Sequence, residues 1–262
     1  MPDTIWNWIV AFLPNPFGFV RAMRGLFPAL RNYSELKCQN RKAGNPFKIR
    51  FTHPNLLDRM ACGGTAKGAY FHQDLLVARR IFERQPIRHI DVGSRVDGFV
   101  AHVASFRKIE TLDIRSIPQK VHNISFVQCD VMNPNPEFME CADSVFCLHA
   151  LEHFGLGRYG DPVDLLGYAK GFFNLTAMLK PGGILYVSVP IGGSERVEFN
   201  GHRIFNPATV LGLACGALDL LSISYVDDNG NLLENTKITP ERIAAGFDCR
   251  HGCGIFEFRK GD

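Results

Sequence analysis

The pattern of apolar and polar residues changes near residue 70. Upstream, short helical patches alternate with Pro14, Pro16, Pro28, Pro46 and Pro54, each of which is expected to interrupt a helix. Downstream, apolar runs typical of buried strands alternate with segments of helical spacing. The expected strands are 87–94, 109–115, 124–133, 142–150, 184–190, 218–226 and 254–260, and the expected helices are 69–85, 98–107, 163–179 and 206–216.

Nearly continuous apolar strands that alternate with helices are typical of a sheet buried on both faces. We therefore expect an α/β fold, a doubly wound and mostly parallel Rossmann-like sheet with helices on both faces, over residues 71–262. A helical and aromatic extension is expected over residues 1–70. The helix at 163–179 is expected to begin with Asp161 as its N-cap and Pro162 in its first turn.

One glycine and two aspartates stand at the ends of three successive expected strands. Gly93 ends the first strand, where a glycine lets the backbone approach a ligand closely. Asp113 follows about 20 residues later, where an acid typically binds a ribose diol. Asp130 ends the third strand and could accept from an adenine amino group. A single aspartate after a strand is usually only part of a solvated turn, but Gly93, Asp113 and Asp130 in order after three strands predict a site for an adenosine-containing cofactor.

The motifs "HIDVGS", "LDIR", "CDVMN", "LHALEH" and "LKPGGILYVSVP" resemble those of Rossmann-like S-adenosylmethionine-dependent methyltransferases over residues 71–226. "EHFGLGRYGDPVD" and "VEFNGHRIF" are similar to a domain family of unknown function, DUF268, within that superfamily. The resemblance implies S-adenosylmethionine as cofactor, with contacts from Asp91, Gly93, Ser94, Asp113, Ile114, Asp130, Val131 and Leu148. The glycine loop departs from the usual pattern, since Arg95 and Asp97 stand at glycine positions, and this leaves the pose of the cofactor open.

The stretch "LHALEHFGLGRYGDP" (148–162) concentrates polar residues at the end of the fourth strand. If "HALEH" begins a helical turn, His149, Glu152 and His153 share one face. His202 follows the end of the next expected strand. Two interpretations stay open. The first is a divalent metal held by His149, Glu152, His153 and His202, zinc, manganese or iron rather than magnesium; the second is a histidine acting as general base without metal. A structural role for the cluster is the remaining alternative.

Further polar residues complete a predicted catalytic and acceptor-binding set. Arg158 and Arg203 are candidates for binding an anionic group by paired hydrogen bonds. Gly155, Gly157 and Gly160 favour a bendable loop that closes over substrate. The predicted set is His149, His153, Arg158, Asp161, His202 and Arg203.

These parts favour O-methylation of a saccharide hydroxyl, because such a hydroxyl must lose its proton as it attacks. The resemblance points the same way, since that family is often found among surface-polysaccharide genes. The expected acceptor is a surface polysaccharide, a nucleotide sugar or a lipid-linked glycan. The alternative function is a non-catalytic module with the methyltransferase fold in a glycan-synthesis complex.

Composition limits the partners and the compartment. The 262 residues carry a net charge of only +3 without a long basic run, so nucleic acid is not expected as a partner. Eight scattered cysteines indicate a reduced, cytoplasmic protein. The aromatic and basic segment 1–30 is expected either to pack on protein or to lie peripherally on the inner face of a membrane. The oligomeric state is left open.

Overall fold

The computed structural model describes residues 16–261, with side chains from Val20 onward. The chain divides after Thr65 into two compact units, 1–65 and 66–262, whereas the sequence places the boundary after residue 70. The helices of the second unit are α3 (Ala69–Arg84), α4 (Ala101–Ala104), α5 (Gly167–Met178), α6 (Pro207–Ala214) and α7 (Pro240–Ala244). Its strands are β1 (His89–Val92), β2 (Ile109–Asp113), β3 (Ile124–Gln128), β4 (Ala142–Leu148), β5 (Leu179–Ile191), β6 (Arg196–Glu198), β7 (His202–Ile204), β8 (Leu218–Val226), β9 (Leu232–Leu233) and β10 (Gly252–Lys260).

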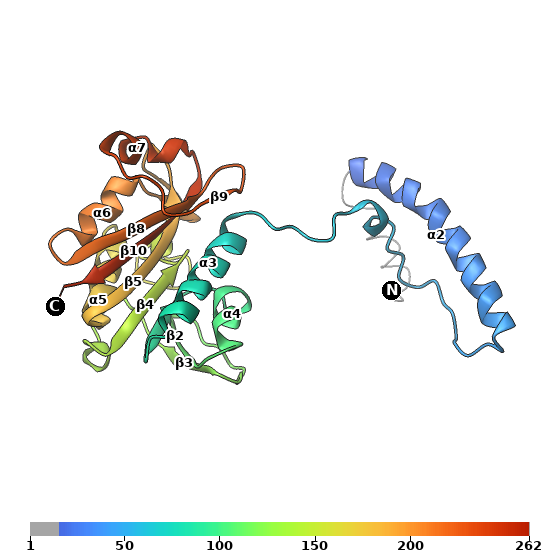
Figure 1. Ribbon diagram of the computed structural model, residues 1–262, viewed down its shortest axis with the longest axis horizontal. Coiled ribbons are helices and arrows are strands. Elements are labelled where there is room, and N and C mark those ends of the chain that lie inside the picture. The colour runs from blue at the N-terminus through green and yellow to red at the C-terminus, as the bar shows by residue number, and fades with distance from the viewer. Residues whose placement is uncertain (1–15, 262) are drawn as a thin grey trace. The chain divides into compact units, whose positions relative to one another are not determined.

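The second unit is built on an eight-stranded sheet of order β3-β2-β1-β4-β5-β10-β8-β9 (Figure 1). The strands from β3 to β5 are parallel, and β10 pairs antiparallel with both β5 and β8. The strand order reverses between β1 and β4. From β1 the chain adds β2 and β3 on one side, and it then returns to add β4 and β5 on the other. The expected mostly parallel, doubly wound sheet is therefore confirmed.

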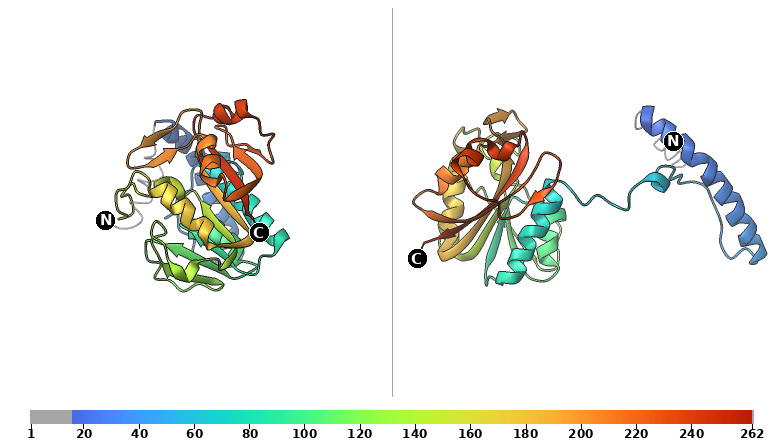
Figure 2. Two further views of the ribbon diagram at one scale, coloured as in Figure 1. Left: turned by 90° about the vertical axis from the view of Figure 1, so that its left-hand side faces the viewer. Right: turned by 45° about the horizontal axis from the view of Figure 1, so that its top comes forward.

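Helices cover both faces of this sheet (Figures 1 and 2). On one face α3 and α4 bury Leu76, Val77, Ile81 and Val103 against strand residues such as Phe146. On the other face α5 and α6 contribute a second apolar cluster, which includes Phe172, Leu175, Met178, Val210 and Ala214. Burial on both faces explains why the strands read as apolar runs rather than as alternating patterns.

The predicted start of the helix after the "GRYGDP" stretch is wrong. Helix α5 begins at Gly167, not at 163. The carboxylate of Asp161 accepts instead from the backbone N–H groups of Gly157 and Tyr159, at 3.1 Å each. Asp161 therefore closes its own loop, as Asp side chains do when they compete with a helix for backbone partners. The expected helix at 98–107 is also shorter, because a π-helical turn at Val96–Val100 precedes α4.

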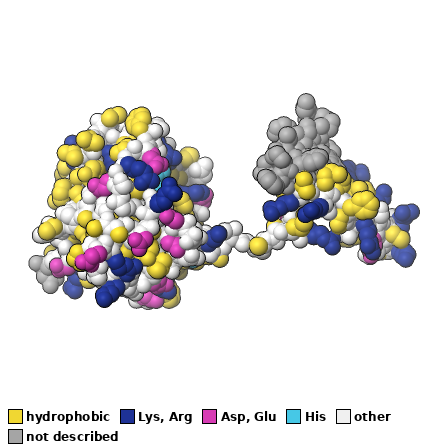
Figure 3. Space-filling view, turned by 90° about the horizontal axis from the view of Figure 1, so that it is seen from above, with side chains coloured by type: hydrophobic (Ala, Val, Ile, Leu, Met, Phe, Trp, Pro, Cys, Tyr) yellow, Lys and Arg dark blue, Asp and Glu magenta, His cyan; other side chains and the backbone are white. Residues whose placement is uncertain are grey.

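Within residues 16–65, the first unit has one long helix, α2 (Pro16–Lys42), which continues through Pro28, so the predicted interruption at this proline is wrong. A short 3₁₀ turn follows at Asp58–Met60, and Figure 3 shows the side chains of this unit. The prediction for residues 1–30 falls partly outside the described chain, because Trp6, Trp8 and the rest of residues 1–15 are not described. Within residues 16–261, the helices are too short or too polar to cross a membrane.

Candidate active site

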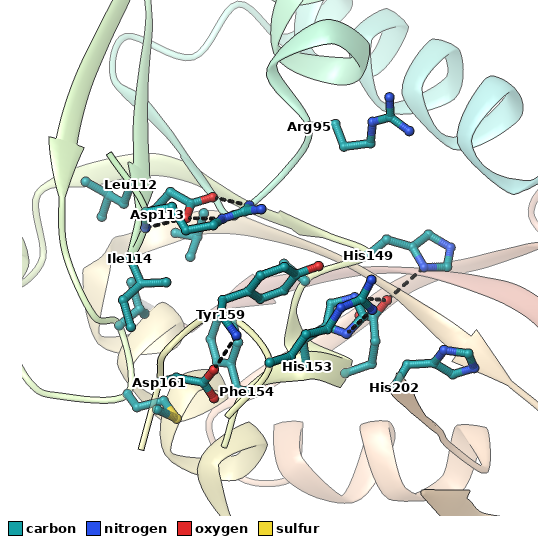
Figure 4. Close-up of a pocket in the computed structure, with 18 of the residues that line it drawn as sticks. Arg95, Leu112, Asp113, Ile114, His149, His153, Phe154, Tyr159, Asp161 and His202 are labelled. Carbon is teal, nitrogen blue, oxygen red and sulfur yellow. Dashed lines mark hydrogen bonds and ion pairs between the residues drawn. The ribbon is translucent and has the colours of Figure 1, made fainter. Parts of the chain in front are cut away.

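A cavity of about 600 Å³ opens at the carboxyl ends of β1, β2 and β4 (Figure 4). This edge, where the strand order reverses, is where open α/β sheets bind their ligands. In Figure 4, Leu112, Asp113 and Ile114 line one half of the cavity, His149, His153 and His202 line the other, and Tyr159 projects between them. The volume suits a ligand of nucleoside size together with part of a second one.

The first half collects five of the residues predicted to bind cofactor: Gly93, Asp113, Ile114, Asp130 and Val131. Gly93 has a φ of +70°, and a Cβ there would stand 2.9 Å from the Cβ of Ala150. A larger residue would therefore push the loop away from the end of β4. Gly93 therefore lets the turn after β1 lie close against Ala150, which leaves room for a ligand in the cavity.

The other three predicted cofactor residues, Asp91, Ser94 and Leu148, do not line the cavity. All three are buried beneath its floor, and the Oγ of Ser94 accepts from the backbone N–H of Leu148 at 3.3 Å. Burial raises the pKa of Asp91 to about 7. Their position indicates that they support the loops of the first half from below.

The two aspartates of this half are already hydrogen-bonded within the chain. Asp113 accepts from the backbone N–H of Arg115 at 2.8 Å and from its guanidinium at 2.7 and 2.9 Å. Asp130 accepts from the backbone N–H of Met132 at 3.0 Å and from the side chain of Asn133 at 2.8 Å. Each carboxylate retains further acceptor capacity toward the cavity, since it has about four lone-pair sites.

The second half is centred on the buried carboxylate of Glu152. Its Oε1 lies 2.9 Å from Nδ1 of His149 and 3.6 Å from Nε2 of His153. The expected helical face is wrong in detail, because only Leu151–His153 forms a 3₁₀ turn and His149 has a φ of +51°. The backbone N–H of His149 is held by the carbonyl and the Oγ of Ser188 on β5. The three side chains still converge, although not through helical i, i+4 spacing.

The two histidines next to Glu152 differ in protonation. Burial disfavours the charged form of His149, but the adjacent Cys253 and Glu152 outweigh it and raise its pKa well above the usual value. Burial lowers the pKa of His153, and the nearby Arg158 adds to this. At neutral pH, His149 is therefore the cationic partner of Glu152, and His153 is the neutral imidazole.

The hydrogen bonds of His153 also decide its tautomer. Its Nδ1 lies 2.8 Å from the carbonyl oxygen of Gly201. A carbonyl can only accept, and it lies closer to Nδ1 than the donor Nη1 of Arg158, which is 3.4 Å away, so the shorter contact favours the tautomer with the hydrogen on Nδ1 and the free lone pair on Nε2. At 3.6 Å, the Nε2 atom is beyond hydrogen-bond distance of Glu152. His153 thus presents a neutral, unprotonated nitrogen in the cavity.

The loop from Gly155 to Asp161 forms the roof of the second half. Arg158 donates to the carbonyl of Gly201 at 2.7 Å, and among the residues that the structure describes it has no carboxylate partner. The ring of Tyr159 lies 4.3 Å from the guanidinium of Arg115 and 5.1 Å from that of Arg158. The ring of Tyr159 therefore lies between Arg115 in the first half of the cavity and Arg158 in the second.

His202 and Arg203, both predicted for the site, lie differently. His202 lines the cavity, with its ring stacked on His251 at 4.9 Å. Arg203 is outside the lining and buried. Its guanidinium donates to the carbonyls of Phe154 at 2.6 Å and of Glu152 at 3.2 Å, and it reaches those of Asp164 and Leu165. Arg203 holds the roof loop in place rather than facing a ligand.

The predicted metal ligands do not form a metal site within residues 16–261, because no three His, Cys, Asp or Glu side chains gather in a suitable arrangement there. The nitrogens that a metal would need are partly used, since Nδ1 of His149 is bonded to Glu152 and Nδ1 of His153 to Gly201. The side chains converge on each other instead of on a common vacant point.

The structure adds residues that the sequence did not indicate. Tyr70 comes from the start of α3, where its ring lies 4.9 Å from that of His149, and the guanidinium of Arg95 lies 5.7 Å from the same ring. Arg115 could have been suspected from its position in "LDIR", two residues after Asp113. Tyr70 and His251 had no local signal, because only the tertiary fold brings α3 and the start of β10 to the cavity.

Solved structures with the same fold include two methyltransferases and a cyclase. The 1,6-didemethyltoxoflavin N1-methyltransferase of Burkholderia thailandensis, solved with 1,6-didemethyltoxoflavin and S-adenosylhomocysteine, has a TM-score of 0.52 at 15% identity over 95% of this chain and 92% of its own. The N-methyltransferase NodS of Bradyrhizobium japonicum WM9 has 0.50 at 14%, over 76% and 100%. The [4+2]-cyclase SpnF has 0.50 at 16%, over 76% and 86%.

These likenesses show that the chain has the Rossmann-like methyltransferase fold. Among curated proteins, none matches the sequence. Residues 96–239, more than half of the chain, match the family described as Caenorhabditis protein of unknown function, DUF268. The matched range spans Asp113, the Glu152 cluster, the roof loop and His202, so it includes most of the cavity lining. The chain therefore belongs to the DUF268 family.

Proposed function

We propose that this protein is an S-adenosylmethionine-dependent methyltransferase that methylates a hydroxyl group of a saccharide. The observation that carries the proposal is the two-sided cavity, which places a neutral histidine nitrogen opposite the strand ends that bind nucleosides in this fold. The same fold binds S-adenosylhomocysteine in the Burkholderia thailandensis enzyme.

The residues of the first half fit such a cofactor. The turn at Gly93 stays low against Ala150, and Asp113 and Asp130 present acceptor oxygens for ribose hydroxyls and an adenine amino group. When bound, S-adenosylmethionine supplies an electrophilic methyl group on its sulfonium. The chain's own contribution is to align the acceptor hydroxyl with that methyl group and to take the hydroxyl proton.

His153 is the residue suited to take this proton. Its lowered pKa keeps it neutral at pH 7, and the carbonyl of Gly201 fixes the tautomer whose Nε2 accepts. Glu152 and the cationic His149 form a balanced pair beside it, so the proton arriving on His153 finds a carboxylate 3.6 Å away. This arrangement suits a hydroxyl, which must lose its proton as it attacks, more than an amine that is already neutral.

The acceptor half also favours a polar, hydroxyl-rich substrate over an apolar one. His202, His251 and Arg158 line it with donors for sugar hydroxyls. An anionic substituent on that sugar, a carboxylate or a phosphate, would find Arg158 available, because among residues 16–261 no carboxylate pairs with it. Such a group would be bound by two parallel hydrogen bonds.

Calorimetric titration of the intact chain with S-adenosylmethionine tests the cofactor assignment. We expect binding, and we expect Asp113→Asn to weaken it by about 1–3 kcal/mol while Asp219→Asn, an exposed control on β8, leaves it unchanged. Absence of binding to the intact chain would refute the proposed enzyme. The acceptor is then sought with methyl-labelled cofactor and a panel of nucleotide sugars and oligosaccharides, with NMR assigning the label to oxygen or nitrogen.

A non-catalytic module with this fold is the second candidate, and the bonds of Asp113 favour it. Arg115 already occupies both carboxylate oxygens, and Arg95 and Asp97 pair with each other at 2.7 Å where glycines are usual. The variant Arg115→Gln separates the two functions. Binding that appears only in this variant would indicate a blocked site and a non-catalytic protein.

A further inference from the structure

Helix α2 of the first unit has one face that is covered by its own unit. Ala22 is fully buried, and a Cβ on Gly25 would stand 1.8 Å from the carbonyl oxygen of Leu56. Further along the same face, the ring of Tyr33 stacks on Phe51 at 5.3 Å. The segment around residues 51–56 therefore occupies this side of the helix.

A second apolar stripe runs along another face of α2 and is exposed among the residues that the structure describes. Its members are Val20, Met23, Phe27 and Leu30, which are exposed by 50, 49, 84 and 45%. Their spacing of three, four and three residues puts them on one line along the helix. Isolated exposed apolar residues are ordinary, but four in one stripe mark an interaction surface.

Basic residues accompany this stripe. Helix α2 carries six Arg and Lys and a single Glu, a net charge of +5 that exceeds the +3 of the whole chain. Arg24 and Arg31 are exposed within about 60° of Phe27 around the helix. In the part of the chain that the structure describes, neither has a carboxylate partner. Figure 3 shows dark blue Lys and Arg side chains beside yellow hydrophobic ones on this unit.

We propose that α2 binds the surface of an anionic lipid bilayer, with Val20, Met23, Phe27 and Leu30 in the acyl boundary and Arg24 and Arg31 at the lipid phosphates. An apolar stripe with flanking cations has the chemistry that such a surface recognises. A second copy of the helix fits poorly, because it would bring another charge of +5 against the first. This inference goes beyond the proposed function and does not depend on it.

Co-sedimentation of the full chain with sucrose-loaded vesicles tests the surface. Vesicles of phosphatidylcholine alone are compared with vesicles that also contain phosphatidylserine, at low and at high salt. We expect binding to the anionic vesicles and a marked loss at high salt, since screening weakens the arginine contacts. Arg24→Gln with Arg31→Gln should lower the partition coefficient by roughly thirtyfold, from the contribution of two basic residues near an anionic surface.

The apolar stripe is tested with a matched pair of variants. Phe27→Gln should lower binding by about tenfold or more. Leu36→Gln is the control, because Leu36 is 53% exposed on the same helix but lies nine residues from Phe27, on the opposite side. Equal effects of the two variants, or no binding to anionic vesicles, would overturn the proposal. So would a dimer in analytical ultracentrifugation that Phe27→Gln converts to a monomer, since the stripe would then be a subunit interface.

Discussion

At the scale of single residues, the two histidines beside Glu152 have pKa values shifted in opposite directions by their surroundings. His149 is tied to the carboxylate by its Nδ1, so the negative charge stabilises its cation. His153 is tied to a carbonyl instead, and burial favours its neutral form. The sequence alone could not distinguish them, because both flank the same "ALE" triplet and the difference arises from Gly201 on a distant hairpin.

The first residue-scale prediction concerns the pH dependence of methyl transfer. A base acts when it is neutral, and the pKa of His153 lies below its usual 6.5. We therefore expect the rate to be independent of pH near 7 and to fall only as pH drops below about 6.5. His153→Gln should lower kcat by 10²–10⁴-fold and remove this acidic limb. The exposed His122→Gln serves as control, and an unchanged limb in His153→Gln would assign the base elsewhere.

The second residue-scale prediction concerns Asp91, which is fully buried with a pKa of about 7. A carboxyl with a folded pKa above its unfolded value stabilises the fold at low pH, and this stability is lost as pH rises toward 7. Between pH 5 and 8, urea unfolding of the wild type should lose about 3 kcal/mol that Asp91→Asn retains. If Asp91→Asn and Asp219→Asn show the same pH dependence, Asp91 does not titrate in this range.

At the scale of elements, the positions of the main strands follow from sequence more closely than the helix starts do. The apolar runs ending at Val92, Asp113, Gln128 and Leu148 predict β1 to β4, because burial on both faces leaves a strong signal. The start of α5 at Gly167 differs from the prediction because the pair Asp161-Pro162 is typical of a helix N-terminus. In the folded chain, local N–H groups of the roof loop compete successfully for Asp161.

The glycines of the roof loop favour a bendable loop on composition alone. In the structure, a glycine is required at two of these positions by the backbone conformation. Gly155 and Gly160 both have left-handed φ values, +74° and +85°. A Cβ at Gly155 would stand 2.0 Å from the carbonyl oxygen of Asp164, whereas one at Gly160 would meet nothing within 4 Å. Gly155 therefore permits tight packing and Gly160 only a left-handed backbone, and Arg203 holds the residues on either side of the loop through four carbonyls.

Alanine variants of Gly155 and Gly160 are expected to differ in stability, with Gly160→Ala as the control. Gly160→Ala should lower the free energy of unfolding by about 1–2 kcal/mol, the cost of a left-handed residue with a Cβ. Gly155→Ala should lower it by about 2–5 kcal/mol, because steric overlap with the Asp164 backbone is added. Urea unfolding of both variants measures the difference. Equal losses would mean that the loop moves aside and is as bendable as its composition indicated.

At the scale of the whole molecule, the last strand in the chain is an interior strand of the sheet. β10 lies between β5 and β8 and pairs with both along most of its length. Ile255, Phe256 and Phe258 are fully buried, and Glu257 pairs with Arg80 and Arg84 of α3. The sheet and the packing of α3 therefore stay incomplete until the C-terminal residues take their place.

A truncation series measures this dependence. Removing residues 252–262 deletes three large buried apolar side chains, Ile255, Phe256 and Phe258, worth about 1.5–3 kcal/mol each, roughly 5–9 kcal/mol together, before Cys253, the lost strand pairing and the unpaired Arg80 are counted. Because that is comparable to the entire stability of a typical domain, about 5–15 kcal/mol, we expect no cooperative unfolding and no near-ultraviolet dichroism. Removal of Gly261 and Asp262 alone should preserve both signals, since Gly261 is exposed beyond the last strand. A cooperative transition in the 1–251 chain would show that the parallel strands fold without β10, and that this strand is an addition to a sheet already stable on its own.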